Sequence, residues 1–528
     1  MLRRPSSRDS SEEAAHLPQA NGMPNPDHGD RARPGRSLLP RSVSRHQVGV
    51  AAVTALAGLA YALLGLVQLR NNRATIFDLV IFDQTIRNYA EFRPPMSPAL
   101  GAFHGTSLDY LQLAEHFSPI LATLTPLYWI HDGPASLILA QSALFSLAIP
   151  PIWRFARRKL GTVPAYLVVA SYATSTAIAQ AAVFDFHEVA FVPVLTAVMI
   201  ERFDAGKPFI GSLAAAGLLL VKEDMGLLVA GFGCFLLATR RFRPGIGFVV
   251  GGLGMIALTR GVFIPAAGGD PATFWAYNYL GRNVPEVLST AVTNPGLVLH
   301  SLVNPPVKVA TMLGLVAPVA FACLLSPLVL PAVPLILERM LSDRPFWWTN
   351  DFQYDAFVIV VVISAAVDGI ARIQRWMDRR HRGHPPASVS RSTPLGLAWA
   401  ALVCGISLAL VPQNALGRLL QPAFYRADFD AVAAAEAAAT IPSGVVVESV
   451  NNMGPALTRR ATVVLWQPQS YRAAWVLANT ERLAYPFASV DQQREKVAEL
   501  VDSGYEIVYE RDGYVVLHHP DGTNAKAQ

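Results

Sequence analysis

Charge is scarce in this sequence. Asp, Glu, Lys and Arg make up 15% of the 528 residues, whereas 52% are hydrophobic. An average soluble protein has roughly 25% charged residues. Long stretches carry no charge at all, and the charged residues gather in short clusters between them. Because a charge at the centre of a bilayer costs about 2.5–3.5 kcal/mol, this distribution excludes an ordinary soluble protein and predicts a polytopic α-helical membrane protein.

Cysteine is scarce as well, and familiar catalytic motifs are missing. The three cysteines, Cys234, Cys323 and Cys404, lie within apolar stretches, so we expect neither a structural disulfide nor a thiolate metal site. The sequence has no Walker motif, nucleophile elbow, zinc-protease motif or Rossmann fingerprint. The net charge of +5 comes mainly from arginine clusters, which we interpret as topology signals and not as a nucleic-acid surface.

About eleven stretches are apolar enough to cross a bilayer, although some are shorter than the usual ~20 residues. They are Val48–Leu69, Pro134–Trp153, Val163–Val183, Val189–Ile200, Phe209–Val221, Met225–Ala238, Ile246–Ala266, Val307–Leu324, Leu328–Leu341, Ala356–Ile373 and Leu395–Val411. A further run, Phe117–Ile130, contains two prolines and is interpreted as a re-entrant or interfacial helix.

Basic clusters set the predicted orientation, because loops rich in Lys and Arg stay in the cytoplasm. The polar residues 1–46 then form a disordered cytoplasmic tail, and residues 47–424 form the transmembrane domain of a protein of the bacterial inner (plasma) membrane. Later basic clusters fall on the same side: Arg154–Lys159, Arg202–Lys207, Arg240–Arg243 and Arg375–Arg391. The extracytoplasmic loops are then residues 70–133, 184–188, 222–224, 267–306 and 342–355.

The segment after the last span reads as a small extracytoplasmic α/β module at residues 425–520, followed by a disordered tail at 521–528. We expect helices at 428–440 and 492–503 and strands at 444–450 and 462–465. A hairpin is expected from 506–510 and 514–518, because Asp512-Gly513 is a strong turn signal.

The first outer loop carries two aspartates. Asp78 and Asp83, with Gln84 beside the second, lie in a stretch whose apolar residues fit helical spacing. The pattern predicts an amphipathic helix at the membrane surface, with Asp78 near the mouth of the bundle. Helix capping plus a solvated face is the simpler alternative.

Further ionisable clusters occur in the other outer loops. They are Glu115-His116, Asp185-Phe186-His187-Glu188, Lys222-Glu223-Asp224 and the pair Gln353-Tyr354 in an aromatic loop. Each has an ordinary explanation: a Lys–Glu pair can neutralise itself, and interfacial Trp and Tyr are common membrane anchors. Their shared side favours one cavity that holds an anionic lipid head group. Lys222, Arg73, Arg87 or Arg282 would bind the phosphate there, an aspartate or histidine would act as base, or a carboxylate would hold a divalent metal such as Mg²⁺ or Mn²⁺.

Taken in order along the chain, these residues resemble a known family. The set Phe77-Asp78, Asp83-Gln84, Glu115-His116-Phe117-Ser118-Pro119, Asp185-Phe186-His187, Lys222-Glu223-Asp224 and Gln353-Tyr354 resembles the bacterial family of predicted membrane proteins called domain of unknown function 2079. The resemblance extends over residues 47–520 and includes Ile441-Pro442 and Gly504-Tyr505. That family is similar in plan to the GT-C superfamily of membrane glycosyltransferases, which use polyprenyl-phosphate sugars and place an essential acid in the first outer loop.

The resemblance implies a GT-C-like fold and transfer of a sugar from a polyprenyl-phosphate donor to an extracytoplasmic glycan, lipid or protein. It makes Asp78 the first choice for catalytic base and Asp83 the second. The residues expected to bind substrate are Gln84, Glu115, His116, Asp185, His187, Lys222, Glu223, Asp224, Gln353 and Tyr354. Two alternatives remain: a transporter or lipid flippase, which needs polar residues along a path through the spans, and a non-catalytic membrane binding protein. Few such polar residues occur, the nearest being Gln141, Gln180 and Arg260.

Overall fold

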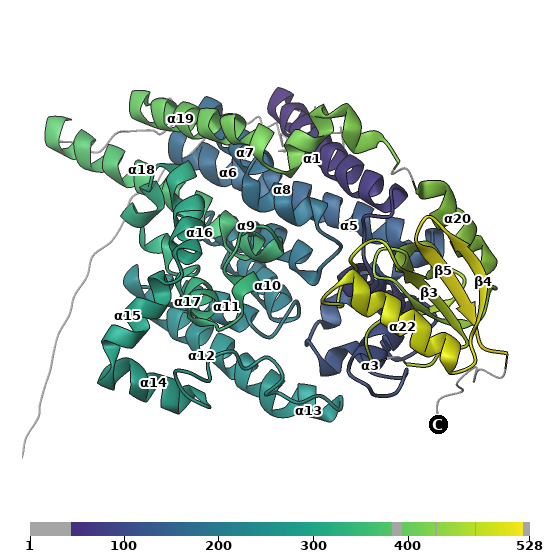
Figure 1. The fold of residues 1–528 in the computed structure, drawn as a ribbon. Helices are drawn as coiled ribbons and strands as arrows, with labels where there is room; N and C mark the ends of the chain where they lie inside the picture. The colour runs from purple at the N-terminus through teal and green to yellow at the C-terminus, as the bar shows by residue number, and fades with distance from the viewer. Residues whose placement is uncertain (1–43, 383–392, 428–429, 470, 521–528) are drawn as a thin grey trace, which may run out of the picture. The chain divides into compact units, whose positions relative to one another are not determined.

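The computed structural model describes residues 44–382, 393–427, 430–469 and 471–520, and the chain from Arg45 onward forms one compact unit. Most of the predicted N-terminal tail, the predicted tail at 521–528 and the middle of the predicted loop Arg375–Arg391 lie outside these residues. A bundle of helices is followed by a small C-terminal sheet (Figure 1).

Five helical stretches are long and apolar enough to cross a membrane. They are α1 (Arg45–Arg70), α5 with α6 (Pro134–Leu160), α7 with α8 (Thr162–Val183), α12 to α13 (Phe242–Ala266) and α19 with its last turn (Pro394–Gln413). A sixth results if Pro295–Val303 and Pro306–Val319, which meet at 70°, count as one broken span. The chain is therefore a membrane protein by composition and helix length, but the prediction of about eleven spans is not confirmed.

The difference arises because several expected spans are short helices. Two of them, α10 (Pro208–Leu219) and α11 (Met225–Ala238), have 12 and 14 residues. At 1.5 Å per residue such helices are roughly 18–21 Å long, less than the ~30 Å hydrocarbon core. The remaining helices are α2 (Ile81–Ala90), α3 (Pro98–Phe103), α4 (Thr125–Ile130), α9 (Phe191–Asp204), α14 (Val284–Thr293), α15 (Pro295–Val303), α16 (Pro306–Val316), α17 (Val333–Leu341) and α18 (Ile359–Arg382).

The segment before α2 departs from its predicted helical form. Helical spacing over Phe77–Gln84 predicts one continuous helix, but the α-helix begins at Ile81. Phe77 and Asp78 have non-helical backbone angles, with φ of −72° and 85° respectively. The chain therefore turns sharply at Asp78 before it enters α2.

The same segment packs between two hydrophobic cores, so it is not the exposed amphipathic surface helix that the sequence predicts. One set of side chains enters the core of the helical bundle: Leu79, Phe82 and Ile86. A second set packs against the C-terminal sheet: Ile76, Val80 and Ile81. Burying such side chains stabilises the fold by about 1.5–3 kcal/mol each, so the apolar residues on both sides of the turn are used for internal packing.

The C-terminal module is a five-stranded mixed sheet in the order β2-β1-β3-β5-β4. Its strands are β1 (Val446–Ser449), β2 (Thr462–Leu465), β3 (Trp475–Asn479), β4 (Glu506–Arg511) and β5 (Tyr514–His518). The predicted hairpin at Asp512-Gly513 joins β4 to β5, and the predicted helices correspond to α20 (Ala431–Thr440) and α22 (Val490–Asp502). The central strand β3 and the short helix α21 (Gly454–Leu457) were not predicted.

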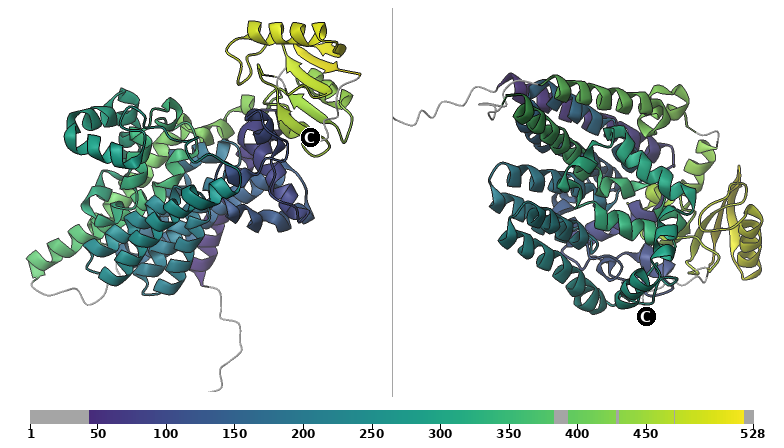
Figure 2. Two further views of the ribbon diagram at one scale, coloured as in Figure 1. Left: turned by 90° about the horizontal axis from the view of Figure 1, so that it is seen from below. Right: turned by 90° about the vertical axis from the view of Figure 1, so that its left-hand side faces the viewer.

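Figure 2 shows this module beside the dark-blue segment that follows α1. The contact includes hydrogen bonds as well as apolar packing. The Gln84 amide donates to the Val463 carbonyl at 2.7 Å, and the Thr458 hydroxyl donates to Asp83 at 2.8 Å. The module is therefore fixed to the first loop of the helical region.

Candidate active site

One cavity of about 700 Å³ brings together most of the predicted site residues, although they come from four separate loops. The predicted residues that line it are Asp78, Glu115, His116, His187, Lys222, Glu223, Asp224, Gln353 and Tyr354. The remaining three, Asp83, Gln84 and Asp185, are not among its lining residues. The wall is completed by aromatic side chains and by two residues of the C-terminal module, Asn451 and Tyr485.

Asp78 is the most unusual residue of the cavity. Its backbone angles, φ 85° and ψ −53°, are those of a strained γ-turn that non-glycine residues rarely adopt. Its side chain is half-buried. Within the described part of the chain, its carboxyl group forms no hydrogen bond or ion pair. A carboxylate held in a strained turn without a partner is available to a ligand in the cavity.

The turn is held in place from two directions. Asp185 accepts hydrogen bonds from the backbone nitrogen of Thr75 at 2.8 Å and from its hydroxyl at 2.5 Å. The side-chain oxygen of Asn451, in the C-terminal module, accepts from the amides of Ile76 at 3.0 Å and Phe77 at 3.2 Å. Asp185 therefore acts on Asp78 through the backbone, although it does not line the cavity.

Burial governs the charge state of both acids. It is the main cause that raises the pKa of Asp78 above its ordinary value, and the nearby positive charges of His187 and Lys222 oppose it only in part. Burial also raises the pKa of Asp185 to about 8, against the hydrogen bonds from Thr75. A raised pKa makes a carboxylate a stronger base, which suits Asp78 for proton transfer.

Two histidines in the cavity each lie beside a glutamate. His116 Nδ1 lies 2.8 Å from Glu223, and its ring stacks on Phe274 with centroids 4.4 Å apart. Burial and the charge of Lys222 lower the pKa of His116, but Glu223 and Glu188 together more than offset these effects, so the net shift is upward. His187 Nδ1 lies 2.8 Å from Glu188, which is fully buried. The hydrogen bond with Glu223 therefore fixes the orientation of the His116 ring, whereas His187 and Glu188 meet in a charge contact without a hydrogen bond.

Lys222 is the central cation of this arrangement. Its ammonium lies 3.6 Å from Glu188. Burial would raise the pKa of Glu188, yet His187 and Lys222 hold it near 2. Burial likewise opposes the charged form of Lys222, but the surrounding carboxylates raise its pKa. Lys222 is therefore a charged ammonium at the cavity wall and can bind an anionic ligand.

Several cavity residues were not predicted as site residues. Arg260 lies 3.5 Å from Asp224, and Arg344 packs over the rings of Phe274 and Trp347. Others are Glu338 and Arg339 in α17 and the module residues Asn451 and Tyr485. Arg260, Glu338 and Arg339 could have been predicted as site residues, because each is a charge inside an apolar stretch. No sequence pattern indicates the two module residues.

The other arginines nominated for phosphate binding lie elsewhere. Arg73 donates to the backbone carbonyls of Phe424 and Arg426, and Arg282 is largely exposed beside Glu286. Arg87 pairs with Asp83 and Asp132, each at 2.9 Å. Of the four nominated cations, only Lys222 lines the cavity.

Asp83 and Gln84 join the first loop to the module instead. Asp83 is fully buried and accepts hydrogen bonds from Tyr128 at 2.7 Å and Thr458 at 2.8 Å, besides its ion pair with Arg87. Gln84 bonds to the backbone of Val463 and Ala99. All of their polar atoms serve structure in this arrangement.

The cavity lining also contains buried polar atoms that have no hydrogen-bond partner among the described residues, one of them on Gln353. Gln353 is buried, and its Oε1 accepts no hydrogen bond from the described residues. Burial of the neighbouring Tyr354 raises its pKa to about 12, so its hydroxyl stays protonated and can donate. No group of three or more His, Cys, Asp or Glu side chains in the described ranges is arranged to hold a metal ion.

Comparison with solved structures finds chains whose fold is similar to this one. The crystal structure of ArnT from Cupriavidus metallidurans bound to undecaprenyl phosphate aligns over 91% of this chain and 99% of its own, with a TM-score of 0.50 and 12% identity. The oligosaccharyltransferase AglB from Archaeoglobus fulgidus, in complex with an inhibitory peptide and a dolichol-phosphate, aligns over 90% of this chain and 75% of its own, with a TM-score of 0.42 and 11% identity.

The chain belongs to the family of predicted membrane proteins called domain of unknown function 2079, whose model matches residues 71–516. The family resemblance seen in the sequence is thereby confirmed. No curated protein matches the sequence.

Proposed function

We propose that this protein is a GT-C-type glycosyltransferase that moves a sugar from a polyprenyl-phosphate donor to an extracytoplasmic glycan, lipid or protein acceptor. The observation that carries the proposal is Asp78, an unpaired carboxylate in a strained turn, within electrostatic reach of the cations of the same cavity. The similarity in fold to ArnT supports it.

The proposed reaction is a single displacement at the anomeric carbon. Asp78 takes the proton of an acceptor hydroxyl while the oxygen forms a bond to that carbon. The bond from the carbon to the phosphate oxygen breaks, and its electron pair leaves with the polyprenyl phosphate. Lys222 and Arg260 stabilise the charge that develops on the phosphate, and the rings of His116 and His187 orient it.

The orientation predicted from the basic clusters is part of this proposal: about eleven crossings of the bacterial inner (plasma) membrane, a cytoplasmic N-terminus and an extracytoplasmic module. The grouping of the loops supports it. Four loops assigned to the outside contribute to one cavity. Residues assigned to the inside pair with one another, Arg158 and Lys159 with Asp204.

A second, polar groove supports a role of the module in acceptor binding. It has a volume of about 350 Å³ and lies between the first loop and the module. Its polar lining residues are Gln84, Arg87, Asn88, Arg93, Asp109 and Thr462. Of these residues, Asn88, Arg93, Asp109 and Thr462 offer amide, guanidinium, carboxylate and hydroxyl groups that suit the hydroxyls of a glycan, so we assign the acceptor chain to this groove.

The direct test incubates purified protein in nanodiscs with a panel of polyprenyl-phosphate sugars and detects transfer or slow hydrolysis by mass spectrometry. Asp78→Asn should lower the rate by about 10²–10⁴-fold and leave donor binding intact. Asp351→Asn is the matched control, because Asp351 is exposed on the aromatic loop outside the cavity lining. Movement of intact donor across a vesicle bilayer without cleavage would support the flippase alternative instead.

A further inference from the structure

A second large cavity lies among the helices α7, α16, α18 and α19, apart from the candidate active site. Its volume is about 590 Å³. Its apolar lining residues include Val168, Leu313, Leu315, Ile359, Ile363, Val403, Ile406 and Leu410. Two of the contributing helical stretches, Thr162–Val183 and Pro394–Gln413, are long and apolar enough to span a membrane, so the cavity is bordered by helices that contact lipid.

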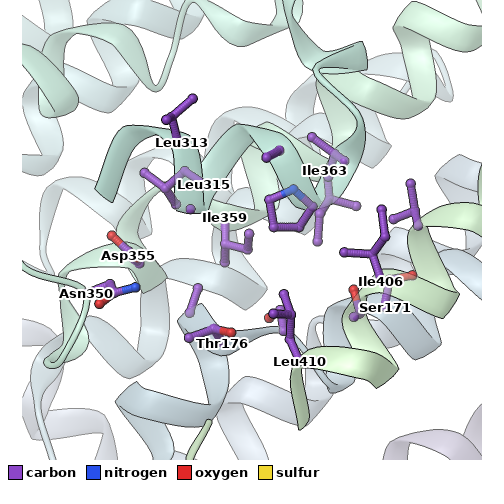
Figure 3. A pocket seen from close by; sticks show the side chains of 18 of the residues that line it. Ser171, Thr176, Leu313, Leu315, Asn350, Asp355, Ile359, Ile363, Ile406 and Leu410 are labelled. Carbon is purple, nitrogen blue, oxygen red and sulfur yellow. The ribbon is translucent and has the colours of Figure 1, made fainter. Parts of the chain in front are cut away.

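One end of this cavity carries its carboxylate and an amide, and other polar side chains, such as Ser171, lie elsewhere along it. Asn350 and Asp355 lie together, with Thr176 nearby, whereas Ile406 and Ser171 lie on the other side (Figure 3). None of the described residues that line the cavity is a Lys, Arg or His. The site is therefore lined mainly by apolar side chains with several hydroxyl and amide groups among them, and its polar end carries a carboxylate and no cation among the described lining residues.

Asp355 is already paired through the wall between the two cavities. Its carboxylate accepts a hydrogen bond from Arg339, which lines the candidate active site. Arg339 also donates to the carbonyls of Trp347 and Thr349, and its side chain is buried. The guanidinium is thus occupied by three partners and is not available to a phosphate in the second cavity.

We propose that this second cavity binds the hydrocarbon chain of a membrane lipid whose head group is uncharged and carries a hydroxyl, as in a diacylglycerol. The hydroxyl donates to Asp355 or exchanges hydrogen bonds with Asn350, and the chain fills the space between Leu315 and Ile406. A phosphate head group would add a negative charge beside the Asp355–Arg339 pair with no further cation among the described lining residues, which is costly in a buried site. The occupant therefore differs from the polyprenyl-phosphate donor, and this inference does not depend on the proposed transfer reaction.

Gly314 lines the cavity, so a larger side chain at this position can be used to fill it. A Cβ placed there meets only Asn350 Nδ2, at 3.8 Å, so a larger side chain enters the cavity near its polar end. Gly405 in α19 is the matched control, because a Cβ at this exposed position meets nothing within 4 Å and the residue does not line the cavity. Gly314→Phe and Gly405→Phe make the same chemical change in an apolar helix.

The experiment uses a diacylglycerol with a diazirine in one acyl chain, incorporated into nanodiscs with the full-length protein. Wild-type protein should be labelled in peptides that contain Leu313, Ile363 or Ile406. Gly314→Phe should lower this labelling by about tenfold or more, equivalent to about 1.4 kcal/mol of binding free energy, while Gly405→Phe stays near wild type. Equal labelling of the two variants would overturn the proposal.

Competition on the wild-type protein provides a second measurement that requires no variant to fold. Unlabelled diacylglycerol should suppress the labelling, whereas phosphatidylglycerol and polyprenyl monophosphate should compete weakly. Stronger competition by either anionic lipid would overturn the assignment of an uncharged head group. Failure of the transferase assay leaves both outcomes unaffected, so the two proposals are tested separately.

Discussion

The carboxyl group of Asp185 lies 2.8 Å from the backbone nitrogen of Thr75, three residues before the strained turn at Asp78. This hydrogen bond, with a second from the Thr75 hydroxyl, joins the loop after α8 to the loop after α1. Strained backbone persists only where the surrounding structure holds it. Asp185 is therefore a positioning residue whose contribution to activity passes through the geometry of Asp78.

Asp185→Ala should lower the turnover number for sugar transfer by about ten- to a hundredfold, because a small displacement of a reacting group is enough for such a loss. Asp185→Asn keeps an acceptor oxygen toward Thr75 and should retain most of the activity. Donor affinity should be similar in both variants, since Asp185 does not line the cavity. A steady-state comparison of kcat and KM checks this; loss of donor affinity equal to the loss of kcat would contradict a positioning role.

The raised pKa of Asp185 also predicts a pH dependence of stability. Its native pKa is about 8, whereas an unfolded aspartate titrates near 3.9. The stabilising contribution of the protonated group is complete below about pH 4 and declines as the pH rises through about 8. The apparent Tm of the wild-type protein in detergent should therefore fall over this range, and Asp185→Asn should flatten the decline. Parallel curves for the two proteins would contradict the assignment.

Much of the candidate site could be predicted because polar loops between apolar helices are confined to the ends of those helices. Lys222 and Glu223 separate α10 from α11, and His187 follows α8, so both segments must emerge at helix ends. The arginine clusters predict that these helix ends lie on one side of the membrane, and the residues there meet in one cavity. The order of the polar motifs along the chain was enough to nominate Asp78, His116 and Lys222.

The departures from prediction come from contacts that are distant in sequence. Helical spacing at Phe77–Gln84 contains no sign of the break at Asp78, because the amides before it are held by Asn451. The role of Asp83 depends on Thr458 in the same way. By contrast, the helices α14 and α15 were missed although local signals exist: Asn283 and Asn294 cap them, each followed within two residues by proline.

Of the four cations predicted to bind phosphate, only Lys222 lines the cavity, and this leads to a binding prediction. Lys222→Ala should weaken the binding of polyprenyl monophosphate by about ten- to a hundredfold and reduce its dependence on salt, because a charge-assisted contact is lost. Arg282→Ala is the control, since Arg282 is largely exposed beside Glu286 and lies outside the cavity. Microscale thermophoresis at two salt concentrations measures both effects; equal changes in the two variants would show that the phosphate is not bound by Lys222.

Asp83 provides the sharpest separation of a structural from a catalytic acid. Its carboxylate is fully buried and bonded to Arg87, Tyr128 and Thr458, so it ties α2 and α4 to the C-terminal module. Removal of one partner from a buried ion pair costs about 3–5 kcal/mol. Asp83→Ala should therefore lower the apparent Tm by several degrees and expose the module to limited proteolysis. Asp83→Asn keeps the side-chain volume and one acceptor oxygen, so its apparent Tm should lie between those of the wild-type protein and Asp83→Ala.

The activity of the folded fraction shows whether Asp83 has a structural or a catalytic role. After removal of aggregated protein by size-exclusion chromatography, Asp83→Asn should transfer sugar at close to the wild-type rate at a temperature below its transition, because Asp83 does not reach the cavity. Asp78→Asn should show the opposite pattern, with a near wild-type Tm and little transfer, since its carboxylate has no partner to lose among the described residues. A stable but inactive Asp83→Asn protein would return Asp83 to the list of catalytic residues and would require a rearranged first loop in the active state.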